Sequence, residues 1–224
     1  MENTSLSQKK SLWSNRWFQI VIVIAGVALL ILGLTKLLSP GSTVSDKFID
    51  KFNELITVSQ EVGGQMTDIG KNIQEVWNKE SAGDYTGALK MVDDFIAQTD
   101  NIANKANLMA DRVIEFKKLA EAVKDQAAKT SSLKVADNLD QLQGLMTKEL
   151  ATLKQLLLFS QEYYSDILAQ KRENILSETE SETLTELVKT MTTDQQKVQE
   201  LVNDFQTNRL EMEKAAGLER TPSE

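Results

Sequence analysis

The sequence predicts an all-α protein in which one N-terminal transmembrane helix is followed by an antiparallel up-down-up-down four-helix bundle of coiled-coil character. Three observations predict this fold class. A long apolar run precedes residue 40, apolar residues recur with a seven-residue period from residue 48 onward, and the only two prolines, Pro40 and Pro222, lie outside the periodic region. Abundant Leu, Lys, Glu, Gln and Ala also favour long helices over sheets.

Residues 18–38 form the predicted transmembrane helix. The stretch from Ile20 to Leu34 has no polar side chain, and the continuation to Leu38 is interrupted only by Thr35 and Lys36. A helix of about 20 mostly apolar residues spans the hydrocarbon core of a bilayer. The run is therefore long enough to anchor the chain in a membrane.

The residues that flank the apolar run predict its orientation. Trp13 and Trp17 on one side and Lys36 on the other are the expected anchors at the membrane interfaces. Three basic residues precede the run and none occurs in 39–45, so segment 1–17 is expected in the cytoplasm. This pattern predicts a plasma or inner membrane protein with an extracytoplasmic C-terminal domain. A cleaved signal peptide is the alternative, but the run is longer than usual and no small-residue cleavage site follows it.

The next element is a short connection. Pro40 and Gly41 interrupt any helix that leaves the membrane, so residues 39–44 are predicted to form a hinge. Residues 45–217 are predicted to form the bundle, and residues 218–224 a flexible tail. Because an even number of helices returns the chain to its starting end, the tail is expected near the membrane.

The bundle is predicted to contain helices over residues 45–79, 84–129, 133–174 and 180–216. Asp84 is expected to cap the second helix, Thr179 and Glu182 have the spacing of a capping box for the fourth, and Gly217 is expected to end it. The inward positions of the first helix are Phe48, Phe52, Leu55, Val62, Met66, Ile69, Ile73 and Val76, and those of the fourth are Leu184, Leu187, Met191, Val198, Leu201, Phe205 and Met212. A three-helix bundle whose fourth helix is swapped into another chain is the structural alternative.

The composition excludes several kinds of chemistry. The chain has no His and no Cys, which excludes imidazole and thiolate catalysis, Cys/His zinc sites and disulfides. No phosphate-binding loop, nucleophile–base pair or metal-ligand spacing is present, so no catalytic residue, cofactor or metal is expected. Glutamates at 178, 180, 182 and 186 are interpreted as an ordinary acidic helix start.

The charge distribution bears on the partners. The whole chain carries a net charge of −8, and residues 1–40 carry +3, which leaves −11 on residues 41–224. An acidic domain is repelled by phosphate backbones, so no nucleic acid is expected as a partner. The expected partners are the lipid bilayer and either another protein or further copies of the chain.

Two features of the helices are candidates for interactions. The candidate partner surface on the third helix consists of Leu157, Leu158, Phe159, Tyr164 and Leu168, because the apolar arc there is wider than a bundle seam requires. A more central, more buried helix is the favoured alternative. In the first helix, Gly63 and Gly70 lie one heptad apart, which fits either close helix packing or a bend.

Polar residues interrupt the predicted seams. They either line a ligand cavity or fix the helix register. The residues concerned are Ser59, Thr99, Ser160 and Asp194 or Gln195.

Three function classes follow. The first hypothesis is a non-catalytic interaction or structural protein, the second is a ligand sensor that works with a partner signalling subunit, and an enzyme ranks last. No residue motif identifies a family.

Overall fold

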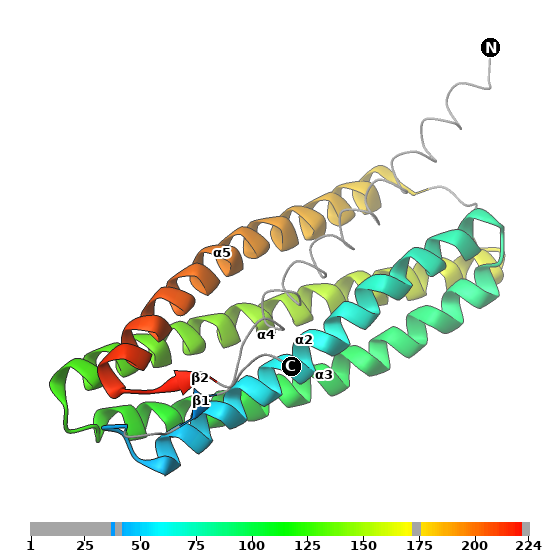
Figure 1. The fold of residues 1–224 in the computed structure, drawn as a ribbon. Helices are drawn as coiled ribbons and strands as arrows, with labels where there is room; N and C mark the ends of the chain where they lie inside the picture. Colours follow the sequence, from blue (N-terminus) through cyan, green and yellow to red (C-terminus); the bar gives the residue numbers. More distant parts are fainter. Residues whose placement is uncertain (1–36, 39–41, 172–175, 221–224) are drawn as a thin grey trace.

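The computed structural model describes residues 37–38, 42–171 and 176–220, and these form four long helices packed in a bundle (Figure 1). The helices are α2 (Asp46–Ser81), α3 (Tyr85–Glu121), α4 (Gln126–Leu168) and α5 (Glu178–Ala216), accompanied by two short strands, β1 (Leu37–Leu38) and β2 (Glu219–Arg220). The predicted all-helical four-helix bundle is thereby confirmed. Helices of 36 to 43 residues are about 54 to 65 Å long at a rise of 1.5 Å per residue.

The predicted transmembrane helix lies outside the described residues except for its last two positions. Leu37 and Leu38 form β1 rather than the end of a helix. Within the part of the chain that the structure describes, no helix combines the length and the apolar character needed to cross a bilayer. The interface residues Trp13, Trp17 and Lys36 are also outside the described residues, so their role stays a prediction.

Each helix begins at a side chain that caps its first turn. Ser45, Asp84 and Asp125 accept hydrogen bonds from the backbone N–H three residues on, and this satisfies one of the unpaired donors of a helix start. The predicted cap at Asp84 is confirmed. The capping box of α5 is formed by Ser177 and Glu180, two residues earlier than the predicted pair.

The turn between α3 and α4 differs most from its predicted position. It was expected near residues 130–132, but α3 ends at Glu121 and α4 begins after Asp125. The hydroxyl of Ser131 donates to the backbone oxygen of Ala127 at 2.9 Å, so this polar side chain is satisfied by its own helix. Polar residues at this point therefore form the first turns of α4 and not a linker.

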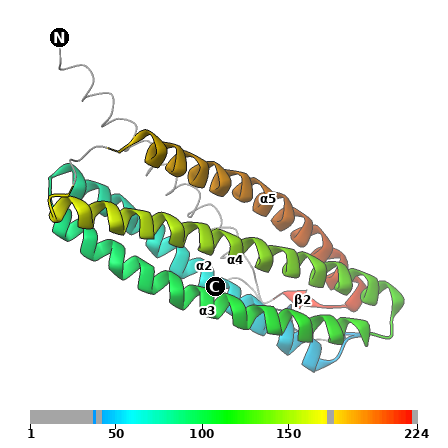
Figure 2. The same cartoon turned by 180° about the vertical axis from the view of Figure 1, so that it is seen from behind.

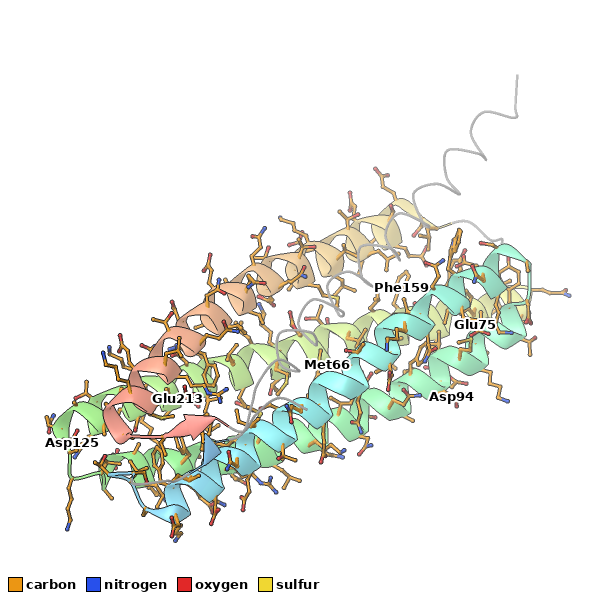
Figure 3. The ribbon with its side chains drawn as sticks, in the orientation of Figure 1. Met66, Glu75, Asp94, Asp125, Phe159 and Glu213 are labelled. Carbon is orange, nitrogen blue, oxygen red and sulfur yellow. The ribbon has the colours of Figure 1, made fainter. Side chains whose placement is uncertain are left out.

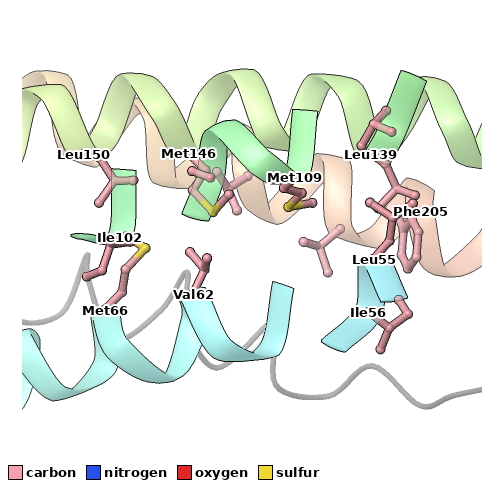
Figure 4. Packing of buried hydrophobic residues seen from close by; sticks show 14 of the residues in the cluster. Leu55, Ile56, Val62, Met66, Ile102, Met109, Leu139, Met146, Leu150 and Phe205 are labelled. Atoms are coloured by element: carbon pink, nitrogen blue, oxygen red, sulfur yellow. The ribbon is translucent and has the colours of Figure 1, made fainter. Parts of the chain in front are cut away.

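The helices pack in sequence order. The closely packed pairs are α2 with α3, α3 with α4, and α4 with α5, whereas α2 and α5 are not such a pair (Figures 1 and 2). Ion pairs link the outer surfaces of neighbours, for example Lys51 with Glu115 between α2 and α3. The core between them is apolar, and Met66, Ile102 and Leu150 lie together at mid-length (Figure 4).

The chain enters and leaves the bundle at the same end, which we call the entry end. β1 pairs with β2 in antiparallel register, Leu37 opposite Arg220 and Leu38 opposite Glu219. Thr43 N–H donates to the backbone oxygen of Ala216 at 2.9 Å, and α5 ends at Gly217 with a left-handed φ of 66°. The predicted helix end at Gly217 is confirmed, and the chain does return to its starting end.

The side chain of Asn53 also fastens the entering chain to α2. Its Oδ1 accepts from Leu37 N–H at 2.8 Å, and its Nδ2 donates to the Leu37 backbone oxygen at 2.9 Å. Leu37 itself is buried. Residues 39–41 of the predicted hinge are outside the described residues, but the positions on both sides of them are attached to the bundle.

Candidate functional site

The predicted partner surface on α4 is divided between the core and the exterior. Leu157 and Tyr164 are fully buried, Phe159 packs partly buried against the core, and Leu158 and Leu168 are each 43% exposed. This corrects the prediction for Leu157 and Tyr164. The reason is that α4 lies between α3 and α5 and packs closely against both, so a wide apolar arc is covered within the chain.

Three of the polar residues in the seams are satisfied within their own helices. The hydroxyls of Ser59, Thr99 and Ser160 donate to the backbone oxygen four residues earlier at 2.8, 2.8 and 2.9 Å. Such bonds fulfil the donor without a ligand or a water. These residues therefore do not supply free groups to a cavity, and among the predicted set Asp194 is the one that differs.

Asp194 and Glu149 form a buried pair of carboxylates between α5 and α4, which we call the carboxylate pair. Their exposed fractions are 1% and 2%. Lys148 lies at the edge with a half-exposed side chain, and its Nζ donates to Asp194 Oδ1 at 2.8 Å. The buried carboxyl group of Asp194 therefore has a cationic partner at hydrogen-bond distance, a geometry that offsets part of the cost of its burial.

Glu149 has no comparable partner. Its Oε1 is buried without a hydrogen bond. Burial, and next the charge of Asp194, raise the pKa of Glu149 to about 8, while Lys148 opposes the rise. At neutral pH the Glu149 carboxyl is therefore mostly protonated and carries a dissociable proton beside Asp194.

A second buried acid lies at the far end of the bundle, where α2 ends. The hydroxyl of Tyr164 donates to Glu80 Oε2 at 3.0 Å. Burial raises the pKa of Glu80 to about 7, and the hydrogen bond from Tyr164 opposes the rise. The rings of Tyr85 and Tyr163 lie 6.3 and 5.5 Å from that of Tyr164, so this acid is enclosed by aromatic side chains.

A buried ion pair lies near the entry end. Arg209 Nε donates to Glu213 Oε1 at 2.7 Å, and the guanidinium lies 5.5 Å from the centre of the Phe52 ring on α2. Asn208 Nδ2 donates to Asn138 Oδ1 at 2.7 Å, so α4 and α5 are also joined there. These contacts specify how the helix ends fit together.

A shallow hollow with a volume of about 580 Å³ lies on the outer surface between α2 and α3. Lys105 and Arg112 face acidic residues such as Glu61 across it, and the side chains of Figure 3 show charged groups spread over the exterior. Over residues 37–38, 42–171 and 176–220, no group of three or more acidic side chains is arranged to hold a metal ion. Glu149 and Glu80, whose pKa values are raised to about 8 and about 7, can bind and release protons near neutral pH.

Sequence reasoning missed both raised acids. The signal for Glu149 was present, because it stands at the seven-residue spacing that joins Leu142, Leu156 and Tyr163 on one face of the helix. The acidic side chain in that apolar row marks a buried carboxyl. The same signal marks Glu80, which stands seven residues after Ile73 and continues the buried row of Phe52 and Met66 to the end of α2.

Comparison of the chain with family models, curated proteins and solved structures finds no match.

Proposed function

We propose that this protein is a membrane-anchored, extracytoplasmic helical bundle that acts by binding another protein or further copies of itself, without catalysis. The apolar run serves as the anchor from residue 18 to residue 36, because Leu37 and Leu38 of the predicted span belong to β1. The basic segment 1–17 then lies in the cytoplasm. The lipid bilayer is the first partner, and a protein bound to the bundle is the second.

The observation that carries this proposal is the attachment at the entry end. An anchor that ends at residue 36 delivers the chain directly to β1 at Leu37, which is fixed by β2 and by the side chain of Asn53. The domain then stands close to the bilayer, and helices of about 54 to 65 Å carry its far end away from the headgroups. Such a geometry suits a spacer or a docking module.

The composition of the bundle also supports a role in binding. Most side chains at its centre are apolar, and the two raised acids lie in the interior, Glu149 beside Asp194 and Glu80 beside Tyr164. The acidic surface favours a partner with a basic face, since opposite charges steer association.

Vesicle flotation tests the anchor. The full-length chain is expected to float with anionic or neutral vesicles, and Ile24→Lys is expected to reduce the floating fraction strongly, because a lysine at the centre of a span costs about 2.5 to 3.5 kcal/mol. The matched control is Lys47→Ile, which changes one charge at the start of α2 and leaves the apolar run intact. Equal flotation of all three chains, or none at all, would refute the anchor.

Crosslinking on intact membranes followed by mass spectrometry tests the binding role. Crosslinks between α3 or α5 and another protein, or between copies of the chain, are the expected result. Recovery of monomer alone would count against it.

A second candidate function is a ligand sensor that works with a signalling subunit. The buried Oε1 of Glu149, which has no hydrogen-bond donor, favours it. A small cationic or hydrogen-bonding ligand that reaches this atom would raise the thermal midpoint of the wild type and not that of Glu149→Gln. A screen of amines that shifts neither chain would refute the sensor.

A further inference from the structure

α2 carries a second buried row beside the one that faces the central core. Its members recur every seven residues, and we call this row the glycine flank. It consists of Ile49, Ile56, Gly63 and Gly70, and all four are buried. Two glycines one heptad apart give a surface without side chains, which allows another helix to approach closely.

α3 lies on the other flank of α2. Lys51 of α2 pairs with Glu115 of α3 at 2.9 Å, and Glu61 of α2 pairs with Lys105 of α3 at 3.2 Å. On the helical wheel, Lys51 and Glu61 lie on the side of α2 that is opposite to the glycine flank. Among the described helices, α3 is the one that packs closely against α2, while α5 packs against α4 (Figures 1 and 2). No described helix is therefore a close partner of the glycine flank.

The entering chain meets α2 on this same flank. Asn53 is four residues after Ile49 and therefore lies on the same side of the helix. Its side chain forms both hydrogen bonds to the backbone of Leu37. Leu37 thus lies beside the glycine flank.

We propose that the apolar segment Ile20–Leu34 has a second binding site on the glycine flank of α2, as an alternative to the bilayer. The proposal rests on the proposed function only in taking this segment as the anchor. Docking on α2 would cover the segment when no membrane is present, and one segment cannot occupy both places. The chain would then alternate between a docked form and an inserted form.

The apolar segment and the glycine flank of α2 have matching lengths. Ile20 lies 17 positions before Leu37, and Gly70 lies 17 positions after Asn53. Two antiparallel helices that start at the joined pair Leu37 and Asn53 therefore run side by side for about 25 Å, at 1.5 Å per residue.

The positions of Gly26 and Gly63 agree as well. In this antiparallel register residue 26 falls opposite residue 64, which brings Gly26 next to Gly63. In the same register Gly70 falls opposite Ile20, and Gly33 falls opposite Thr57. A glycine on each helix at one level permits close backbone contact there, and the gap at Gly70 can receive the side chain of Ile20. The remaining members, Ile49 and Ile56, supply apolar contact toward the entry end.

Spin labels on the full-length chain test the proposal, and the absence of native cysteines makes the labelling specific. The labelled pair is Ala25→Cys with Asp68→Cys, where Asp68 has an exposed side chain on α2. Docking predicts a distance of roughly 15 to 25 Å in detergent-free buffer, from an axial offset of about 5 Å, an interaxial distance of 8–10 Å and the label arms. An undocked helix that points away from the bundle predicts about 40 Å. Dilution with unlabelled chain removes distances between molecules.

A pair of glycine variants supplies the control. Gly63→Leu fills the flank and is expected to move the population to the long distance. Gly64→Leu is expected to leave the short distance unchanged, because a Cβ at Gly64 meets no atom within 4 Å. Circular dichroism of both variants reports whether the bundle is intact. The proposal fails if buffer gives only the long distance, if the full-length chain precipitates without detergent, or if both variants act alike.

Bilayer nanodiscs separate this proposal from the anchor itself. The long distance is expected there, because the segment leaves the flank for the lipid. A short distance in nanodiscs would refute the anchor and leave docking intact, whereas a long distance in both media would refute docking alone.

Discussion

Replacement of Glu149 by glutamine is expected to stabilise the protein at neutral pH, and the size of the effect follows from burial. The ordinary pKa of the glutamate is 4.5, and burial beside Asp194 raises it to about 8 in the folded chain. The folded state therefore binds a proton that the unfolded state releases between these values. The contribution of Glu149 to the free energy of unfolding is fully present at pH values below 4.5 and is lost as the pH rises toward 8.

The magnitude can be worked from the shift. Each pKa unit corresponds to about 1.4 kcal/mol. The free energy of unfolding at pH 7 is therefore roughly 3 kcal/mol lower with Glu149 than with a side chain of the same shape that does not ionise. Glutamine has the shape of the protonated acid and carries no charge. Glu149→Gln is therefore expected to raise the free energy of unfolding by up to about 3 kcal/mol at pH 7, and by less than about 1 kcal/mol at pH 5.

Urea unfolding of the full-length chain in mild detergent, followed by circular dichroism, measures this difference at pH 5, 7 and 8.5. Glu162→Gln is the matched control, because Glu162 is exposed on the same helix. Its curves are expected to follow those of the wild type at every pH. A gain for Glu149→Gln that is the same at pH 5 and pH 8.5 would show that the Glu149 carboxyl does not titrate in this range, and the reasoning would be refuted.

Three further outcomes are expected. Glu80→Gln should reduce the loss of unfolding free energy between pH 5 and pH 8, because the folded pKa of Glu80 is about 7 against 4.5 ordinarily, and an unchanged pH slope in urea unfolding would contradict this. Asn53→Leu should speed hydrogen exchange at the Leu37 amide several-fold, since that N–H loses its acceptor, and equal exchange in both chains by mass spectrometry would disprove the role of this contact. Gly217→Ala should lower the free energy of unfolding by about 1 kcal/mol because its φ of 66° is left-handed, and a urea midpoint that does not move would count against it.

The fold was predictable where apolar residues recur without interruption. The inward residues predicted for α2 from Phe48 to Val76 are all buried, because its heptad pattern has one polar interruption. In α5 the prediction shifted by one position at two places, and Val188 and Val202 are buried instead of the leucines that precede them. Polar residues stand in that seam, and Asp194 is stabilised by Lys148, a contact that no single-helix pattern reveals.

The candidate sites were less predictable than the fold, since burial depends on which helices become neighbours. A wide apolar arc on α4 is compatible with an exposed surface or with a helix that is covered on two flanks. Because α3 and α5 both pack against α4, Leu157 and Tyr164 are buried. Likewise, a glutamate in an apolar row is recognisable, but its raised pKa depends on how deeply the neighbouring helices bury it and next on the proximity of Asp194. The transmembrane helix at 18–38 stays a prediction from the sequence alone.

The pairing of β1 with β2 determines how the molecule responds to mechanical load. Tension applied through residues before Leu37 acts first on two strand residues and the amide of Asn53, since these join the entering chain to the rest. Rupture of so few hydrogen bonds requires little force, and the helices behind them would stay folded. The entry end would therefore yield before the bundle does, and the freed linker would lengthen the tether by several residues.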